Sequence, residues 1–301
     1  MSTASSSSAR PVVVGVDGSD PSIAAAVYGA DLARRRRLPL LLVHVTPWNL
    51  SGTVAPTPSA DLGGALEESA EQLLRTVQAE VLERTGPLPA VSSRVLDDYP
   101  VPGLCRISGE AAVLVLGRRG SRGLPGLMAG STASGVVQHA RCPVVVLPAE
   151  DTTRAGQRRP VVVGVEAAPE DEQVLAFAVA EAADRRTDLV AVHAWREIAL
   201  EVSARRPTPF VDWTGVAEEE QALLAESVAG WRDKEPDVAI REVLVRDRPA
   251  TALREAALDA ELLVVGHRHR PALARLGSTV HGLLHRAPCP LVVVPIEESA
   301  R

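Results

Sequence analysis

Aromatic residues are scarce in this sequence, making up 3% of its 301 positions, whereas hydrophobic residues together make up 46%. A hydrophobic core must therefore be built from Val, Leu, Ile and Ala, which is typical of parallel strands that are covered on both faces. Cationic residues are not in excess either, since the formal net charge is −6. This charge argues against a dedicated nucleic-acid binder, which would carry a basic surface.

Cysteine is also rare: the chain has only Cys105, Cys142 and Cys289, with no CxxC spacing. Neither a disulfide framework nor a zinc ribbon is indicated, and reduced thiols in the cytoplasm are the simplest interpretation. No run of about 18 apolar residues is present, so no membrane span is expected. Residues 1–9 are polar, lack an apolar signal core and are expected to form a disordered tail.

The chain contains an internal repeat. The matching segments are residues 11–16 and 160–165, 41–45 and 190–194, 113–117 and 262–266, and 141–148 and 288–295. The first three pairs are 149 residues apart and the last pair is 147 apart, so two residues are missing from the second half. Solenoid repeats have periods of about 20–50 residues, so this longer period indicates a duplicated domain. We expect one domain over residues 1–149 and a second over 158–301.

Each half alternates apolar, β-branched runs with helical patterns. In the first half the expected strands are residues 12–16, 40–45, 91–96, 113–116 and 144–147. The expected helices run from about 20 to 36, 60 to 84, 101 to 109, and from 131 to just before Cys142. Such alternation predicts an α/β fold with a parallel sheet and right-handed crossovers. Ligands of such sheets bind beyond the carboxyl ends of the strands.

A glycine-rich loop follows the fourth strand, with the spacing Gly117-x2-Gly120-x9-Gly130-Ser131 and then Thr132. Gly117 ends a buried strand, where a missing side chain would let a ligand approach, and Gly120 permits a turn with positive φ. The last three residues open a helix whose N–H groups and hydroxyls favour an anion. Composition alone leaves open a glycine-rich loop without a ligand.

The whole chain resembles the universal stress protein family in its ATP-binding form. The resemblance lies in GVDGS after the first strand, VHV on the second, the G-x2-G-x9-G-S loop, and CPVVVLP at the last strand. It implies two tandem Rossmann-like domains, similar to adenine nucleotide alpha hydrolases. Each domain would hold a five-stranded parallel sheet of order 3-2-1-4-5 with helices on both faces.

The resemblance also implies the site residues. Asp17 matches the family's acidic residue near the adenine and ribose, Gly15 lines the same pocket, and Val45 matches the backbone position that reads the adenine. The loop that would bind the phosphates and ribose comprises Leu116, Gly117, Gly120, Gly130, Ser131 and Thr132. The expected ligand is ATP with Mg²⁺.

The second half departs from this pattern. Its loop reads Gly266-x2-His269-x7-Gly277-Ser278 and then Thr279, so a histidine replaces the central glycine and two residues are lost. Asp17 becomes Glu166, whereas Gly164 keeps the place of Gly15. These changes predict a degraded second site, with one ATP per chain in the first half.

Other signatures are absent or weak. The chain has no G-x4-G-K-[ST] phosphate loop and no G-x-G-x-x-G dinucleotide fingerprint. His281 and His285 have a spacing that can share a metal, but no carboxylate accompanies them. We interpret them, with His267 and His269, as solvated histidines and expect no metal site.

The predicted function is therefore that of an ATP-binding regulatory protein of the stress response, without catalytic residues. A slow ATPase or nucleotide-processing enzyme, and a nucleotide-free scaffold, remain as alternatives. In the family, single domains dimerise through their last strands. Here residues 144–147 and 291–294 are expected to pair edge to edge as an intrachain pseudo-dimer, which leaves a homodimer of whole chains open.

Overall fold

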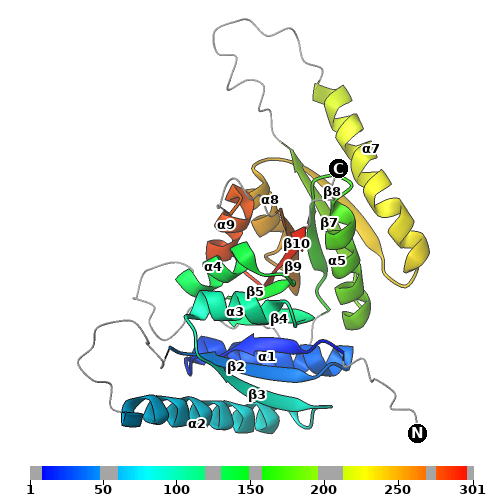
Figure 1. The fold of residues 1–301 in the computed structure, drawn as a ribbon. Coiled ribbons are helices and arrows are strands. Elements are labelled where there is room, and N and C mark those ends of the chain that lie inside the picture. Colours follow the sequence, from blue (N-terminus) through cyan, green and yellow to red (C-terminus); the bar gives the residue numbers. More distant parts are fainter. Residues whose placement is uncertain are drawn as a thin grey trace, which may run out of the picture. The chain divides into compact units, whose positions relative to one another are not determined.

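The computed structural model describes residues 9–47, 60–118, 130–148, 158–195, 213–268 and 276–296, with the backbone alone at 60–62. The chain divides into two compact units, Met1–Ala149 and Glu150–Arg301, which are called here the first and second domains (Figure 1). Within the described ranges, none of the helices combines the length and the apolar composition that crossing a membrane requires.

The first domain alternates strands and helices along the chain. Its strands are β1 (Val12–Gly15), β2 (Leu40–Val45), β3 (Val91–Leu96), β4 (Val113–Gly117) and β5 (Val144–Leu147). Its described helices are α1 (Asp20–Arg36), α2 (Ala60–Thr85), α3 (Pro100–Ser108) and α4 (Ser131–His139). All pairings among these strands are parallel, in the order β3-β2-β1-β4-β5. The predicted fold and strand order are thereby confirmed.

The second domain repeats this arrangement. Its strands are β6 (Val161–Val165), β7 (Leu189–Trp195), β8 (Ile240–Arg246), β9 (Leu262–Arg268) and β10 (Leu291–Ile296). Its described helices are α5 (Asp171–Arg185), α7 (Trp213–Lys234), α8 (Pro249–Ala256) and α9 (Ser278–Arg286). These strands are again all parallel, in the order β8-β7-β6-β9-β10. Because β6 to β10 correspond to β1 to β5 in the repeat, the two domains have the same strand order.

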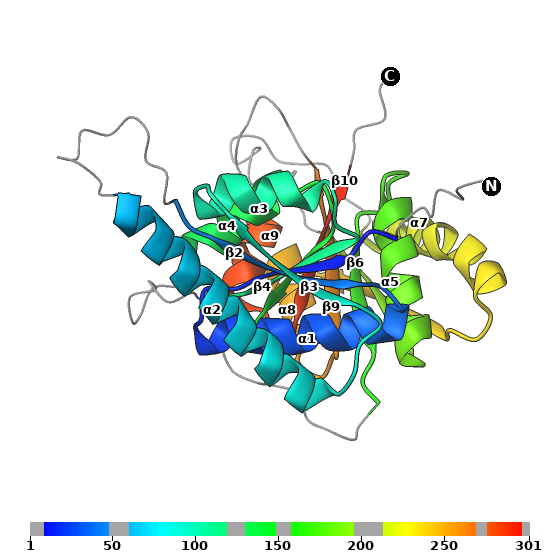
Figure 2. The same cartoon turned by 60° about the horizontal axis from the view of Figure 1, so that its bottom comes forward.

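Helices cover both faces of each sheet. In the first domain α1 and α2 pack on one face, and α3 and α4 pack together on the other (Figure 2). In the second domain the pairs are α5 with α7 and α8 with α9. Because both faces are covered, successive strand residues are buried without alternation: Val12, Val13 and Val14 are all 0% exposed.

A few boundaries differ from the prediction. β1 ends at Gly15 rather than at residue 16, and β4 extends to include Gly117. α3 starts at Pro100, one residue before the predicted start, because proline suits the first turn of a helix. The predicted edge-to-edge pairing of the two last strands concerns the placement of one domain against the other, and it stays a prediction.

Candidate functional site

The carboxyl ends of β1, β2 and β4 bring together most of the residues predicted for the first site. β1 pairs with β2 on one side and with β4 on the other, so the strand order reverses between β1 and β4. Gly15 ends β1, Val45 ends β2 and Gly117 ends β4, while Asp17 follows β1. This is the switch point at which open α/β sheets bind their ligands.

The turn after β1 holds the Asp17 carboxylate in place. Its Oδ1 accepts hydrogen bonds from the backbone N–H of Ser19 at 3.1 Å and from the Ser19 hydroxyl at 2.5 Å. Ser19 occupies the N-cap position of α1, but its hydroxyl makes no capping bond and serves Asp17 instead. Gly18 makes the turn with a φ of +81°. The hydroxyl oxygen of the buried Ser22 accepts a hydrogen bond from the N–H of Asp17 at 3.3 Å, which helps to hold the turn.

The two ends of the glycine-rich loop are held together at the end of β4. The N–H of Arg118 donates to the carbonyl of Leu147 at 3.1 Å, and the N–H of Gly130 donates to the carbonyl of Arg118 at 2.7 Å. Gly130 is the N-cap of α4, and Ser131 in its first turn is exposed. Residues 119–129, which include Gly120, lie outside the described ranges. The bond at Gly130 therefore sets the positive end of α4 beside the switch point.

The glycines at the strand ends are explained by packing. A Cβ on Gly117 would lie 2.6 Å from the carbonyl oxygen of Pro21, in the first turn of α1. A Cβ on Gly15 would lie 2.6 Å from Cδ2 of the buried Leu116. The sequence argument gave Gly117 the role of admitting a ligand, but the space left by its missing side chain is filled by α1.

The second domain has a cavity of about 640 Å³ at the equivalent strand ends. It lies at the carboxyl ends of β6, β7 and β9 and the start of α9. Of the predicted second-site residues, the following line it: Gly164, Glu166, Gly266, Gly277, Ser278 and Thr279. His269 lies outside the described ranges. The altered half thus retains a cavity where the degraded site was expected.

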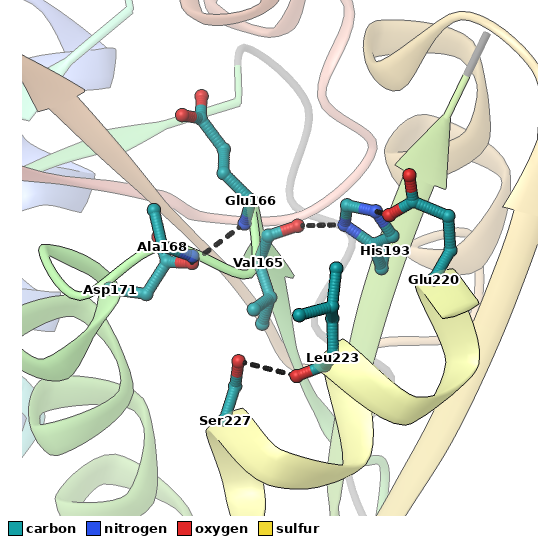
Figure 3. Close-up of polar contacts among 8 residues, drawn as sticks. All are labelled: Val165, Glu166, Ala168, Asp171, His193, Glu220, Leu223 and Ser227. Carbon is teal, nitrogen blue, oxygen red and sulfur yellow. Dashed lines mark hydrogen bonds and ion pairs between the residues drawn. The ribbon is translucent and has the colours of Figure 1, made fainter.

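The turn after β6 is anchored by a buried carboxylate. Asp171 is 4% exposed, and its Oδ2 accepts the N–H groups of Glu166 at 2.8 Å and of Ala168 at 3.0 Å (Figure 3). Burial raises the pKa of Asp171; the two N–H groups oppose this rise, and the nearby charge of Glu166 adds to it. Ala167 takes the place of Gly18 and keeps a positive φ of +58°.

An ion pair also borders the cavity. Nη2 of Arg268, at the end of β9, lies 2.8 Å from Oε2 of Glu166 and 3.8 Å from Oε2 of Glu170. Arg268 and Glu166 both line the cavity. Glu166, which follows β6, and Arg268, which ends β9, therefore form an ion pair at the edge of this cavity, a contact that the sequence analysis did not predict.

His193 lines the same cavity and links β7 to its neighbours. Its Nδ1 lies 2.8 Å from the carbonyl oxygen of Val165, and its Nε2 lies 2.9 Å from Oε2 of Glu220 on α7 (Figure 3). In the first domain Nδ1 of His44 lies 2.7 Å from the carbonyl oxygen of Val16. The repeat had aligned the two histidines, but neither was predicted as a site residue.

The expectation of solvated histidines is wrong for His267, which lies within β9 and is only 6% exposed. The two histidines on α9 contact one another. The rings of His281 and His285 meet edge to face, with their centroids 4.6 Å apart. Among the described residues there is no group of three or more His, Cys, Asp or Glu side chains that could hold a metal ion.

Comparisons with known proteins match the full length of the fold. The family model described as "Universal stress protein family" matches residues 8–148 and again 157–295. Universal stress protein Rv2005c of Mycobacterium tuberculosis is 37% identical over 288 residues, covering 94% of this chain and 96% of that protein. Rv2623 of the same organism is 36% identical over 296 residues, with coverage of 96% and 97%.

A solved structure supports the fold. The crystal structure of a universal stress protein from Archaeoglobus fulgidus aligns with a TM-score of 0.67 over 95% of this chain and 98% of that one. Its sequence identity is 18%, so this likeness bears on the fold alone.

Proposed function

The chain belongs to the universal stress protein family, and from this premise we propose that its first domain binds ATP with Mg²⁺. In this proposal the protein is a nucleotide-dependent regulator of a stress response and holds one ATP per chain. The supporting observation is the hydrogen bond from the N–H of Gly130 to the carbonyl of Arg118, at 2.7 Å.

This hydrogen bond matters because it fixes where a helix begins. The N–H groups in the first turn of α4 have no partner within the helix, and the hydroxyls of Ser131 and Thr132 add donors at the same helix end. The helix dipole adds a partial positive charge there. Arg118 follows β4 directly, and Arg119 and Arg122 come next in the sequence. These groups fit the triphosphate, whose charge they would offset.

Asp17 fits the opposite end of the ligand. Its carboxylate is oriented by Ser19 and follows β1, next to the strand that leads to Val45. A carboxylate accepts hydrogen bonds from ribose hydroxyls, and a charge-assisted bond of this kind contributes about 1.5–3 kcal/mol. The backbone at Val45 would then read the edge of the adenine, as the family resemblance implies.

We propose binding rather than catalysis. Hydrolysis of ATP needs a base or a group that positions water beside the γ-phosphate. Asp17 lies after β1, where the proposal places the sugar. Incubation with Mg·ATP and chromatography of the products tests this point, because a steady release of ADP would identify a slow ATPase instead.

Equilibrium dialysis with Mg·ATP tests the site itself. We expect a ratio near one per chain, which Gly120→Val abolishes by filling the phosphate loop. Asp17→Ala should weaken binding by about 1.5–3 kcal/mol, and the matched control is Asp31→Ala, which removes a surface acid from α1. Unchanged affinity in both site variants would reject the assignment. Binding that survives Gly120→Val and is lost on Gly277→Val would place the ATP in the second domain.

A further inference from the structure

The second-domain cavity has a different charge arrangement from the first site. At the repeat offset of 149, Arg268 corresponds to Arg119 in the loop proposed to meet phosphate. Arg268 lies 2.8 Å from Glu166 and 3.8 Å from Glu170, so its charge is already met by two carboxylates. A triphosphate arriving here would have to compete with them for the guanidinium.

Asp171 adds a further negative charge behind this pair. Its counterpart in the first domain is the neutral Ser22, which makes the same bond to the residue after the strand. Burial is the main cause that raises the pKa of Asp171, and the nearby charge of Glu166 adds to the rise, whereas the two backbone N–H bonds and the charge of Arg268 oppose it. A phosphate chain bound over this turn would be repelled by both carboxylates.

Apart from Glu166, Asp171, Arg268 and the two histidines His193 and His267, the side chains that line the cavity are uncharged. Its walls include the apolar side chains of Val192, Leu253, Val265 and Ile296, which would enclose a planar ring. Glu166 remains accessible, since its side chain is 71% exposed, and its carboxylate can accept bonds from ligand hydroxyls. The hydroxyls of Ser278 and Thr279 also line the cavity.

We propose that this cavity binds an uncharged ligand made of a planar ring and a hydroxyl-bearing group, such as a nucleoside, and that Glu166 makes it reject polyphosphates. Glu166 does so by holding Arg268 and by presenting its own charge, with Asp171 reinforcing the repulsion. The proposal rests on the proposed function only in assigning the ATP to the first domain. The duplicated fold then holds two sites that differ in the charge of their ligands.

Calorimetry on the full chain carrying Gly120→Val tests this, because that variant removes the first site. Adenosine is the uncharged probe and Mg·ATP the polyphosphate probe. We expect adenosine to bind at one per chain, and ATP to bind at least about tenfold more weakly, a ratio that corresponds to a difference of about 1.4 kcal/mol. An absence of adenosine binding, or ATP binding as tight as adenosine, overturns the proposal.

A gain of binding tests the role of Glu166. Glu166→Gln releases Arg268 and keeps the size of the side chain, so ATP affinity in the Gly120→Val background should rise at least about tenfold. Adding Asp171→Ser, which copies Ser22, should raise it further. The matched control is Glu172→Gln, which removes a surface charge at the start of α5 whose side chain is 74% exposed. An equal gain in the control, or no gain with Glu166→Gln, contradicts the assigned role.

The proposed function and this inference fail in different ways. If the unmodified chain binds no ATP while adenosine binds at one per chain, the first-site assignment is wrong and the second-site assignment stands. If the unmodified chain binds two ATP molecules with similar affinity, the rejection of polyphosphates by the second domain is wrong. Thermal melting of each variant identifies any that do not fold. If the variant with Asp171→Ser does not fold, Glu166→Gln alone decides the result.

Discussion

Ser22 and Asp171 occupy the same position in the two domains and accept the same backbone hydrogen bond. Ser22 Oγ accepts the N–H of Asp17 at 3.3 Å, and Asp171 Oδ2 accepts the N–H of Glu166 at 2.8 Å. Both residues are 4% exposed. The duplication thus kept the support of the turn while it exchanged a neutral hydroxyl for a carboxylate at one of the two sites.

Asp171 should make the second domain less stable as the pH rises. Because its pKa in the folded chain is raised above the usual 3.8, the folded state holds this proton at pH values where the unfolded chain has lost it. Stability from this residue is therefore full below 3.8 and is lost as the pH rises through the folded pKa. Each tenfold difference in proton affinity corresponds to about 1.4 kcal/mol.

Urea unfolding of the wild type and of Asp171→Asn between pH 4 and 7 measures this effect. The variant keeps an oxygen that can accept the two N–H groups but has no titrating proton. Its stability relative to the wild type should rise with pH and then level off once Asp171 is ionised in the folded chain. A relative stability that falls with pH would mean that the two N–H bonds outweigh the cost of burial.

Ala167 holds a backbone conformation that its first-domain counterpart, Gly18, adopts without strain. Both have positive φ, +58° and +81°. The left-handed region costs an L-residue about 1–2 kcal/mol, while glycine makes the unfolded chain more flexible by about 0.4–1 kcal/mol. Ala167→Gly should therefore stabilise the second domain by about 0.5–1 kcal/mol, seen as a higher urea midpoint at constant slope.

The control for this substitution is Ala168→Gly, one residue along, which lies outside the left-handed region. It should lower the midpoint, since it adds flexibility without relieving strain. The opposite substitution at the equivalent position of the first domain is Gly18→Ala. It should lower stability by more than Ala167→Gly raises it, because the new Cβ would also lie 3.0 Å from Cδ1 of Leu73. Equal effects of the two alanine-to-glycine changes would show that strain at Ala167 is not the cause.

The three cysteines should differ in reactivity. Burial raises the pKa of Cys142 and of Cys289 to about 12, so at pH 8 only about one thiol in ten thousand is a thiolate. Burial also raises the pKa of Cys105, but this residue is only half-buried. Iodoacetamide followed by mass spectrometry should label Cys105 first in the native chain, and all three alike in urea. Early labelling of Cys142 or Cys289 would contradict their burial.

The sequence predicted the framework well because its signals are local. Runs such as Val12–Val14 and Leu40–Val43 are continuously apolar, which is typical of a parallel strand covered on both faces. The glycine spacing from Gly117 to Gly130 carried part of the family resemblance, and the ATP-binding role of this loop stays a prediction. The strand order came from the family resemblance, since alternation of strands and helices does not by itself fix which strands are neighbours.

The polar contacts of the site could not be predicted in this way. The hydroxyl of Ser19 can form hydrogen bonds with several neighbouring groups. The sequence alone does not show that it donates to the Asp17 carboxylate instead of capping α1. In the sequence Asp171 is only an acidic residue at the start of a helix, and the folded turn is needed to show that it accepts the N–H groups of Glu166 and Ala168. Likewise, the pairing of Arg268 with Glu166 joins residues 102 positions apart, so it depends on the sheet that brings β6 and β9 together.

Arg185 and Glu181 form a buried ion pair on α5, and replacing either residue alone should lower the stability of the second domain. Their side chains are 4% and 2% exposed, with Nη2 of Arg185 lying 2.8 Å from Oε2 of Glu181, and Arg185 also contacts Glu261. Arg185→Met removes the cation that pairs with this buried carboxylate, which should cost about 3–5 kcal/mol.

At the repeat offset the place of Glu181 is taken in the first domain by Leu32, which is 1% exposed. The sheet and helix at this position can therefore accommodate an apolar side chain.

Adding Glu181→Leu to Arg185→Met should recover most of the lost stability, because replacing a buried ion pair by apolar groups is often neutral. Glu181→Leu alone should cost less than Arg185→Met alone, since Arg185 keeps its contact with Glu261, whose side chain is 34% exposed and can reach water. Urea unfolding of the two single variants and the double variant forms a double-mutant cycle, whose coupling energy measures this dependence. Additive losses would show that the two charges are solvated independently and that the pair does not act as a unit.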